Sequence, residues 1–307
     1  MNLNQVYTQL AALFITMFLG YMMGKFNIIK KTAAESFSEF VINVALPAIT
    51  ISGMNIPLTS EKLDQTIWIL ALSIPAYGLA FIAGIISARL LTKDRAKRNV
   101  YIFALLFSNS SYMGLPVFQS IYGKESIFYV ILYGIPFNIL FFTLGIKLMS
   151  NSKEENAFDW KVFINPGLIA TFGSLALFLM NLQLPALLTG TLDMVGNTCV
   201  PLSMIVIGVM LSELPLKEML ANKGVYIFTI VRLVVLPLLT LILFKYIFKI
   251  QDKWLLAVPI IVSGMPVGTS LGMLAKKYNN NETLSSQTIL ISTLFSCLTI
   301  PLLIYLL

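Results

Sequence analysis

The sequence predicts an all-α integral membrane protein with ten transmembrane helices in two inverted five-helix repeats. Two observations predict the membrane class: 57% of the 307 residues are apolar, and the mean hydropathy is +0.84. Only 11% of the residues are charged, whereas soluble domains carry about 25%. A soluble chain of this length could not hide so much apolar surface, which excludes a soluble enzyme. A third observation, a repeated pair of motifs, predicts the two halves.

Ten segments are long and apolar enough to span a bilayer, because a spanning helix needs about 20 mostly apolar residues. Their ends are uncertain by about two to four residues. We expect the spans at Val6–Met23, Phe37–Met54, Thr66–Leu91, Val100–Tyr122, Ser126–Met149, Val162–Gln183, Ala186–Leu211, Lys223–Lys245, Trp254–Lys277 and Leu284–Leu306.

The loops predict how the chain crosses the membrane. A polar linker at residues 151–161 separates a first repeat, residues 1–150, from a second, residues 162–307. Lys and Arg gather in the loops after odd-numbered spans, most densely at Arg89–Arg98. Because basic loops stay in the cytoplasm, we expect a multi-pass protein of the cell membrane with this linker inside and both termini outside. The basic clusters alternate with apolar runs, so they predict contact with the lipid bilayer and no nucleic-acid partner.

Two motifs occur in the same order in both halves. Asn-x-x-x-Pro is found at Asn43–Pro47 and Asn197–Pro201, and Gly-x-Pro-Val at Gly114–Val117 and Gly264–Val267. The prolines of the two motifs are 69 residues apart in the first half and 65 in the second. Five spans in each half put the halves in opposite orientations, an arrangement typical of secondary transporters.

The second motif predicts that helices 4 and 9 are broken at Pro116 and Pro266. Proline removes a backbone donor and clashes with the carbonyl four residues earlier, so we expect residues 112–116 and 262–266 to be non-helical. We expect the two breaks to meet near the bilayer midplane, where irregular backbone must be buried in protein or line a cavity. A half-helix that restarts after each break would offer unpaired amides to an anion. These amides belong to Val117, Phe118, Val267 and Gly268.

Polar residues gather around these breaks and around the asparagine motifs. Buried amides and hydroxyls are costly unless they are hydrogen-bonded, so they either join helices or line a path. For Asn43 and Asn197 both interpretations stay open, because each amide can satisfy a carbonyl that its proline frees. The predicted substrate-binding residues are Asn43, Ser108, Asn109, Ser110, Ser111, Gly114, Pro116, Val117, Asn197, Gly264, Pro266, Val267, Gly268 and Thr269.

Two ionisable residues lie inside predicted spans, where such residues are functional candidates. Arg232 is either a counter-ion for the substrate or a side chain that extends to the cytoplasmic interface. Asp193 either carries a coupling proton or lines an outer vestibule. The chain has no histidine and few carboxylates, so we expect no catalytic residues and no metal site.

With these motifs the chain resembles the auxin efflux carrier family over essentially its whole length. The resemblance rests on Asn43–Pro47, Ser108–Pro116, Asn197–Leu202 with Gly208, and Gly264–Pro266. It implies two inverted repeats in which helices 4 and 9 cross at their breaks. It also implies a scaffold of helices 1, 2, 6 and 7 and a transport domain that moves in an elevator-like way. The short linker is similar to that of compact prokaryotic malate and malonate permeases.

The expected function is therefore secondary transport of a small organic anion, either a dicarboxylate or an auxin-like carboxylate, without a cofactor. Coupling to H⁺ or to Na⁺, the direction of transport and a homodimeric state all remain open. One alternative is a sodium-coupled symporter of a larger amphipathic anion. Another class of alternative is a membrane-embedded enzyme or a receptor.

Overall fold

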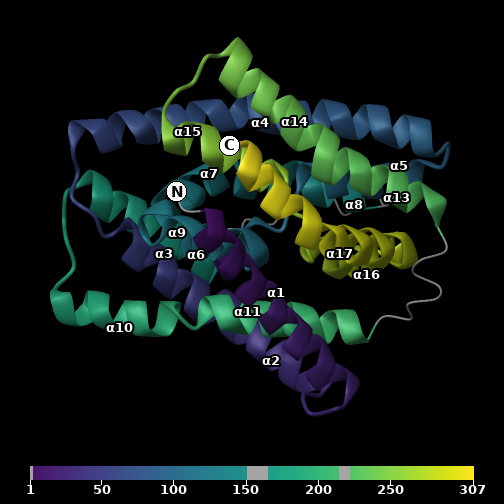
Figure 1. Ribbon diagram of the computed structural model, residues 1–307, viewed down its shortest axis with the longest axis horizontal. Coiled ribbons are helices and arrows are strands. Elements are labelled where there is room, and N and C mark those ends of the chain that lie inside the picture. The colour runs from purple at the N-terminus through teal and green to yellow at the C-terminus, as the bar shows by residue number, and fades with distance from the viewer. Residues whose placement is uncertain (1–2, 151–164, 214–221) are drawn as a thin grey trace. The chain divides into compact units, whose positions relative to one another are not determined.

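A computed structural model describes residues 3–150, 165–213 and 222–307 (Figure 1). Every named element in these ranges is a helix, as expected. The chain divides into two compact units, each holding helices from both sequence halves: unit 1 is Met1–Trp68, Ser111–Ile135 and Trp160–Leu214, and unit 2 is Ile69–Ser110, Pro136–Asp159 and Pro215–Leu307. The units are defined by contacts within the fold, whereas the repeats are defined by similarity between the two sequence halves. The predicted repeat boundaries, residues 1–150 and 162–307, therefore stay a prediction. The predicted linker 151–161 lies outside the described residues.

Unit 1 contains the N-terminal helices of both halves. The label η denotes a π-helix, which has i→i+5 hydrogen bonds. In the first half its elements are α1 (Leu3–Lys25), α2 (Lys31–Phe40), η1 (Val41–Ala45), α3 (Leu46–Met54), the start of α4 (Ser60–Leu91), α6 (Leu115–Tyr122) and most of α7 (Glu125–Leu140). In the second half they are α9 (Pro166–Leu179), α10 (Ala186–Gly196) and α11 (Cys199–Ser212).

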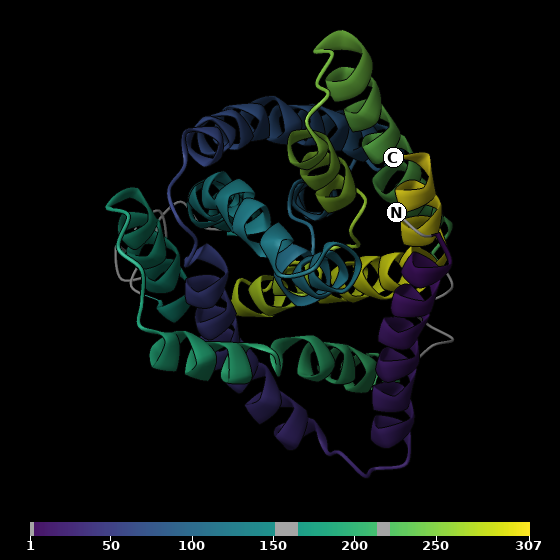
Figure 2. The same cartoon turned by 60° about the vertical axis from the view of Figure 1, so that its left-hand side comes forward.

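Two close helix contacts organise unit 1. Helix α1 packs on α11, and a methyl group added at Gly208 would collide with the carbonyl oxygen of Met17. Gly20 likewise faces the backbone of Ile205, so small residues let the two backbones touch, as is common between membrane helices. Helices α10 and α11 follow one another through a turn at Asn197 and Thr198 (Figure 2), and α3 packs against both α9 and α10.

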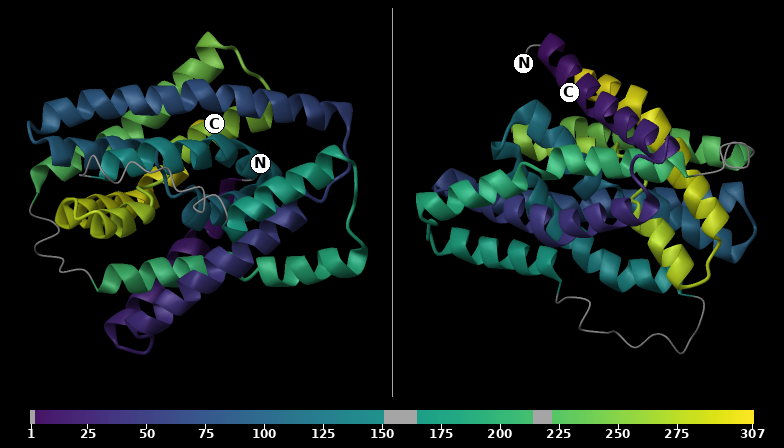
Figure 3. Two further views of the ribbon diagram at one scale, coloured as in Figure 1. Left: turned by 180° about the vertical axis from the view of Figure 1, so that it is seen from behind. Right: turned by 90° about the horizontal axis from the view of Figure 1, so that it is seen from below.

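Unit 2 contains the remaining helices. Its first-half elements are most of α4, α5 (Arg95–Leu106), the end of α7, η3 (Phe141–Gly145) and α8 (Ile146–Met149). Its second-half elements are α13 (Lys223–Ile230), η5 (Val231–Val235), α14 (Leu236–Leu241), η6 (Ile242–Ile247), α15 (Lys253–Ser263), α16 (Ser270–Lys277) and α17 (Glu282–Leu306). Helices α16 and α17 pack together (Figure 3), and α17 also contacts α5, α13 and α15.

Seven helices among the described residues are long and apolar enough to cross a membrane. They match the predicted spans 1, 2, 3, 5, 7, 8 and 10 and begin and end at Tyr7–Lys25, Lys31–Met54, Ser60–Leu91, Glu125–Met149, Ala186–Ser212, Lys223–Ile247 and Glu282–Leu306. The predicted sixth span begins outside the described residues, and the fourth and ninth are interrupted, so each shows only shorter helices. The total of ten spans and the inverted repeats therefore stay predictions.

The expected break of helix 4 at Pro116 is wrong in position. Helix α5 ends at Leu106, and the π-helix η2 (Ser110–Gly114) begins after three residues and runs without a gap into α6. Pro116 thus lies in a helical segment. Three π-helices, η1, η2 and η5, each end two residues before a proline. A proline leaves the carbonyl four residues earlier without its donor and crowds it, and a widened turn relieves that clash without breaking the helix.

Candidate functional site

The two interrupted helices of unit 2 begin in the same way. An aspartate caps the first turn of each: Asp94 accepts a hydrogen bond from the Ala96 amide at 2.8 Å, and Asp252 accepts one from the Trp254 amide at 2.8 Å. These caps satisfy amides that a helix start leaves unpaired. Helix α5 then ends at Leu106 and α15 at Ser263. Each end leads into a non-helical segment, residues 107–109 and residues 264–269.

The two non-helical segments pair with each other and form what we call the crossing, residues 107–109 with residues 266–268. Ser108 and Val267 make an isolated antiparallel β-bridge. The Asn109 amide donates to the Pro266 carbonyl at 2.8 Å, and the Gly268 amide donates to the Phe107 carbonyl at 3.2 Å. Two irregular segments of helices 4 and 9 therefore meet, as expected, but the first is residues 107–109 and not residues 112–116. The second includes Pro266, as expected, but begins at Gly264, because Val262 and Ser263 are still helical.

Gly268 lets the two backbones meet at the crossing. A Cβ atom at this residue would lie 3.2 Å from the Ser108 carbonyl oxygen and 3.4 Å from that of Phe107. Both neighbours are backbone atoms of the segment that pairs with residues 266–268, so they have little room to move. Glycine is needed here for close approach rather than for an unusual φ angle.

The expectation that the amides of Val267 and Gly268 face a substrate is wrong for this structure. The Val267 amide donates to Ser292 Oγ of α17 at 3.0 Å, and the Gly268 amide is bonded to Phe107. Met265 does not cap a helix, because α16 begins at Ser270 after Thr269. In the first half, Leu115, Val117 and Phe118 lie within a helix that continues from η2, so their amides are not at a helix start.

Asn109 is the polar side chain that the crossing leaves least satisfied. Its side chain is buried, with only 4% of the residue exposed, and its Nδ2 has no hydrogen-bond partner among the described residues. Ser108 is also buried, whereas Ser110 and Thr269 are half-buried. The crossing therefore combines one unused amide donor with neighbouring hydroxyls.

Arg232 contacts both broken helices. It lies in η5 with 1% of the residue exposed, its Nε donates to the Met265 carbonyl at 3.0 Å, and its Nη1 donates to the Leu105 carbonyl. An arginine that extends to the membrane interface would place its head in water. The interpretation of Arg232 as a side chain extending to the cytoplasmic interface is therefore wrong, because the guanidinium is enclosed in unit 2.

The other predicted residues lie in unit 1. Ser111 and Gly114 are in η2, Pro116 and Val117 in α6, and Asn43 is an exposed residue of η1. Two further predicted residues have partners in this unit: Asn197 Oδ1 accepts a hydrogen bond from Gln119 Nε2 at 3.1 Å, and Asp193 forms an ion pair with Lys124, whose Nζ lies 2.5 and 2.7 Å from the two carboxylate oxygens.

Sequence reasoning missed three contributors to these contacts: Ser292, Gln119 and Lys124. Ser292 is one of many hydroxyls on α17, and nothing in its spacing distinguishes it. Gln119 follows Pro116 by three residues and Asn197 lies in the other half, so only the fold brings the two amides together. Lys124 lies in the loop between α6 and α7, and a lysine in a loop is indistinguishable in sequence from an ordinary surface residue.

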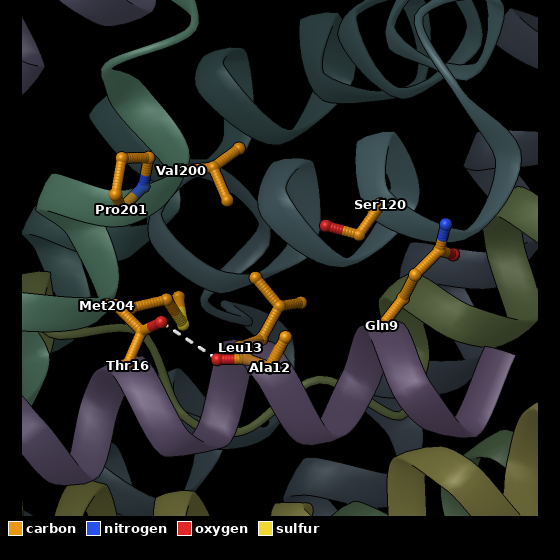
Figure 4. A pocket seen from close by; sticks show the side chains of 8 residues that line it. All are labelled: Gln9, Ala12, Leu13, Thr16, Ser120, Val200, Pro201 and Met204. Atoms are coloured by element: carbon orange, nitrogen blue, oxygen red, sulfur yellow. Dashed lines mark hydrogen bonds between the residues drawn. The ribbon is translucent and has the colours of Figure 1, made fainter. Parts of the chain in front are cut away.

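Unit 1 also holds a cavity of about 310 Å³ between α1, α6 and α11 (Figure 4). This volume is at the lower end of the range for small-molecule sites. Its wall is mostly apolar, and Ser120 on it is the neighbour of Gln119 in α6. The lining residues are Gln9, Ala12, Leu13, Thr16, Ser120, Val200, Pro201 and Met204.

Comparison with known proteins agrees with this architecture. Residues 5–304 match the family described as Membrane transport protein (Mem_trans). A protein of Rhizobium meliloti (strain 1021) named "Putative malonate transporter" is 24% identical, over 94% of this chain and 92% of that protein. Proteins named as uncharacterized transporters are 26% identical, over 94% of both chains, in Methanothermobacter thermautotrophicus and Methanocaldococcus jannaschii. The chain is a multi-pass membrane protein and belongs to the membrane transport protein family, which is the auxin efflux carrier family.

Proposed function

We propose that this protein is a secondary transporter that moves a small organic anion across the cell membrane, and that Asn109 at the crossing binds a carboxylate of that anion. Membership of the family supports the transporter class. The relative named as a malonate transporter supports a small dicarboxylate as the first substrate to test. The crossing supports the place of binding.

The observation that carries the proposal is the unused donor of Asn109. Its Nδ2 is buried and has no partner among the described residues, and leaving such a donor unsatisfied costs about 1–3 kcal/mol. A carboxylate oxygen is a strong acceptor for an N–H donor. Binding an anion would therefore remove a penalty that the substrate-free protein carries.

The surroundings of Asn109 also favour a negative group. One helical segment begins at Ser110 and another at Ser270, and the N-terminal end of a helix carries roughly half a positive charge. The hydroxyls of Ser108, Ser110 and Thr269 can donate to the remaining carboxylate oxygens. Neutral donors and partial charges would hold the anion without a full counter-charge, which makes its release easier.

An elevator-like movement fits the division of the chain. The helices that the family resemblance assigns to the scaffold are α1, α2–α3, α9 and α10–α11, and all of them belong to unit 1. The crossing and Arg232 belong to unit 2. We propose that unit 2 carries the anion, that unit 1, which holds Asn43, Asn197 and the Asp193–Lys124 pair, is the scaffold, and that both termini face outward.

Uptake into proteoliposomes tests the proposed site with an Asn109→Ala variant and labelled malonate, malate and indole acetate. A lost hydrogen bond to a charged group is worth about 1.5–3 kcal/mol, so the apparent substrate constant should rise about ten- to a hundredfold. Thr240→Val is the matched control, because the Thr240 hydroxyl is also buried in unit 2 but bonds to Leu236 of its own helix. It should leave uptake unchanged.

The same assay separates the proposal from its competitors. Asn109→Asp keeps the shape of the side chain but places a negative charge beside the anion, so it should transport less than Asn109→Ala. Separately imposed H⁺ and Na⁺ gradients identify the coupling ion. An Asn109→Ala protein that transports every carboxylate as the parent does would show that the anion binds elsewhere, and sodium-driven uptake of only a larger amphipathic anion would replace the substrate class.

A further inference from the structure

Arg232 is a full positive charge enclosed within unit 2. It lies in η5, where the neighbouring sequence Val231–Val235 is otherwise apolar, and only 1% of it is exposed. An ionised side chain in such a place is expensive unless hydrogen bonds and opposite charge compensate it. The groups that compensate this buried charge therefore indicate the role of Arg232.

The two acceptors of Arg232 lie near the C-terminal ends of the two broken helices. Leu105 is in the last turn of α5, and Met265 follows the end of α15. In a continuous helix the Asn109 amide would donate to the Leu105 carbonyl, but here it donates to Pro266 instead. The crossing thus takes away the normal partner of Leu105, and the guanidinium supplies a new one.

The charges of these groups balance. Each helix C-terminus carries roughly half a negative charge, so the ends of α5 and α15 together carry about one, which matches the single positive charge of Arg232. Helix C-terminal carbonyls of this kind bind the coupling cation in transporters with broken helices. In this protein the guanidinium bonds to a carbonyl in the last turn of α5 and to the Met265 carbonyl, two residues beyond the end of α15.

We propose that Arg232 is a resident cation: a positioning residue that holds the ends of α5 and α15 together and takes the place of a mobile cation at those two carbonyls. The helix ends balance its charge, and its Nε and Nη1 are bonded to backbone carbonyls, so the role that we propose for it is structural and not that of a counter-ion for the substrate. This inference is independent of which anion the protein carries.

Chemical rescue of a purified Arg232→Ala variant tests the proposal by thermal unfolding, which needs no transport assay. Removing one partner of a buried charged contact should lower the Tm by roughly 5–10 °C. Guanidinium chloride at millimolar concentration should restore part of this loss in a saturable way, because the free ion fits the vacated carbonyls. The Tm of the parent should not rise, since its own side chain fills the position.

Arg98→Ala is the matched control. Arg98 Nε also donates to a backbone carbonyl, that of Thr92 at 2.8 Å, but at a partly exposed loop of the same unit. This variant should lose little stability, and guanidinium should not rescue it. If Arg232→Ala is folded and guanidinium does not raise its Tm above the effect seen with Arg98→Ala, the resident-cation role is wrong.

Arg232→Lys keeps the proposal testable if the alanine variant does not fold. Lysine retains the charge but is a point donor that cannot span two carbonyls as the planar guanidinium does. We expect a reduced Tm with an apparent anion constant within about threefold of the parent in proteoliposomes. An unchanged Tm together with a tenfold rise in the anion constant would instead identify Arg232 as a substrate counter-ion.

Discussion

The two interrupted spans, the predicted helices 4 and 9, carry the same Gly-x-Pro-Val sequence but break differently. In the second, the motif Gly264–Val267 lies inside the break, which continues to Thr269. In the first, the break is residues 107–109, and the motif Gly114–Val117 begins five residues later within helical structure. The motif therefore does not mark the break. The two breaks share two features. Each follows a helix whose first turn is capped by an aspartate, and the backbone of each break pairs with the backbone of the other break.

The comparison teaches that pairing partners, rather than prolines, decide where these helices stop. A carbonyl or amide released from a helix inside a membrane protein needs another partner, and residues 107–109 and 266–268 supply one another. Among the described residues, no segment pairs in this way with the backbone at Pro116. Its local clash is relieved by the π-turn of η2, so the chain stays helical there.

The largest effect is expected where the second break differs from the first, at Gly268. Gly268→Val adds atoms toward the Ser108 and Phe107 carbonyl oxygens, which a Cβ alone approaches at 3.2 and 3.4 Å. Overpacking of this kind costs about 1–3 kcal/mol, and we expect a clear fall in Tm and loss of uptake. Gly272→Ala, four residues later in α16, is the control, because its Cβ meets only the Ile289 side chain at 3.4 Å. A Gly268→Val protein as stable as the parent would mean that the crossing is not tightly packed.

An intermediate effect is expected from Ser292→Ala, which tests whether the second break depends on α17. The variant leaves the buried Val267 amide without its acceptor, at a cost of about 1–3 kcal/mol. Ser285→Ala on the same helix removes a hydroxyl that bonds only to the carbonyl of Asn281, so its loss should be smaller. Thermal unfolding of the two variants measures the difference. Equal losses would contradict a special role for Ser292.

The smallest effects, with opposite signs, are expected at the two motif prolines. Pro266→Ala frees the backbone of a non-helical segment in the unfolded chain and should cost about 0.4–1 kcal/mol. Pro116→Ala replaces a poor helix former within a helical segment and should be neutral or slightly stabilising, because η2 can tighten toward an α-helix. The Tm of each variant gives the sign. A loss of stability at Pro116 equal to that at Pro266 would remove the distinction between the two motifs.

The sequence predicts the membrane class because long apolar runs are a strong signal. It also predicts that irregular segments of helices 4 and 9 meet, but the Gly-x-Pro-Val motif behind that prediction lies in only the second of the two segments. It misplaces the first break because proline has two outcomes in a helix, and the choice depends on a partner segment more than a hundred residues away. It also assigns the amides of Val267 and Gly268 to a ligand, since the sequence alone cannot show that Ser292 and Phe107 accept from them. The site of Arg232 depends on the same long-range contacts.

The pairing of Ser108 with Val267 can form only after the second of the two segments has been synthesised. The two residues are 159 positions apart in the chain. At about 5–20 residues per second, the ribosome takes about 8–32 s after making the first segment to make the second. Throughout that interval the Phe107 carbonyl and the Asn109 amide lack their final partners, so this part of the nascent chain must stay near the insertion machinery, or near water, until the second segment is made.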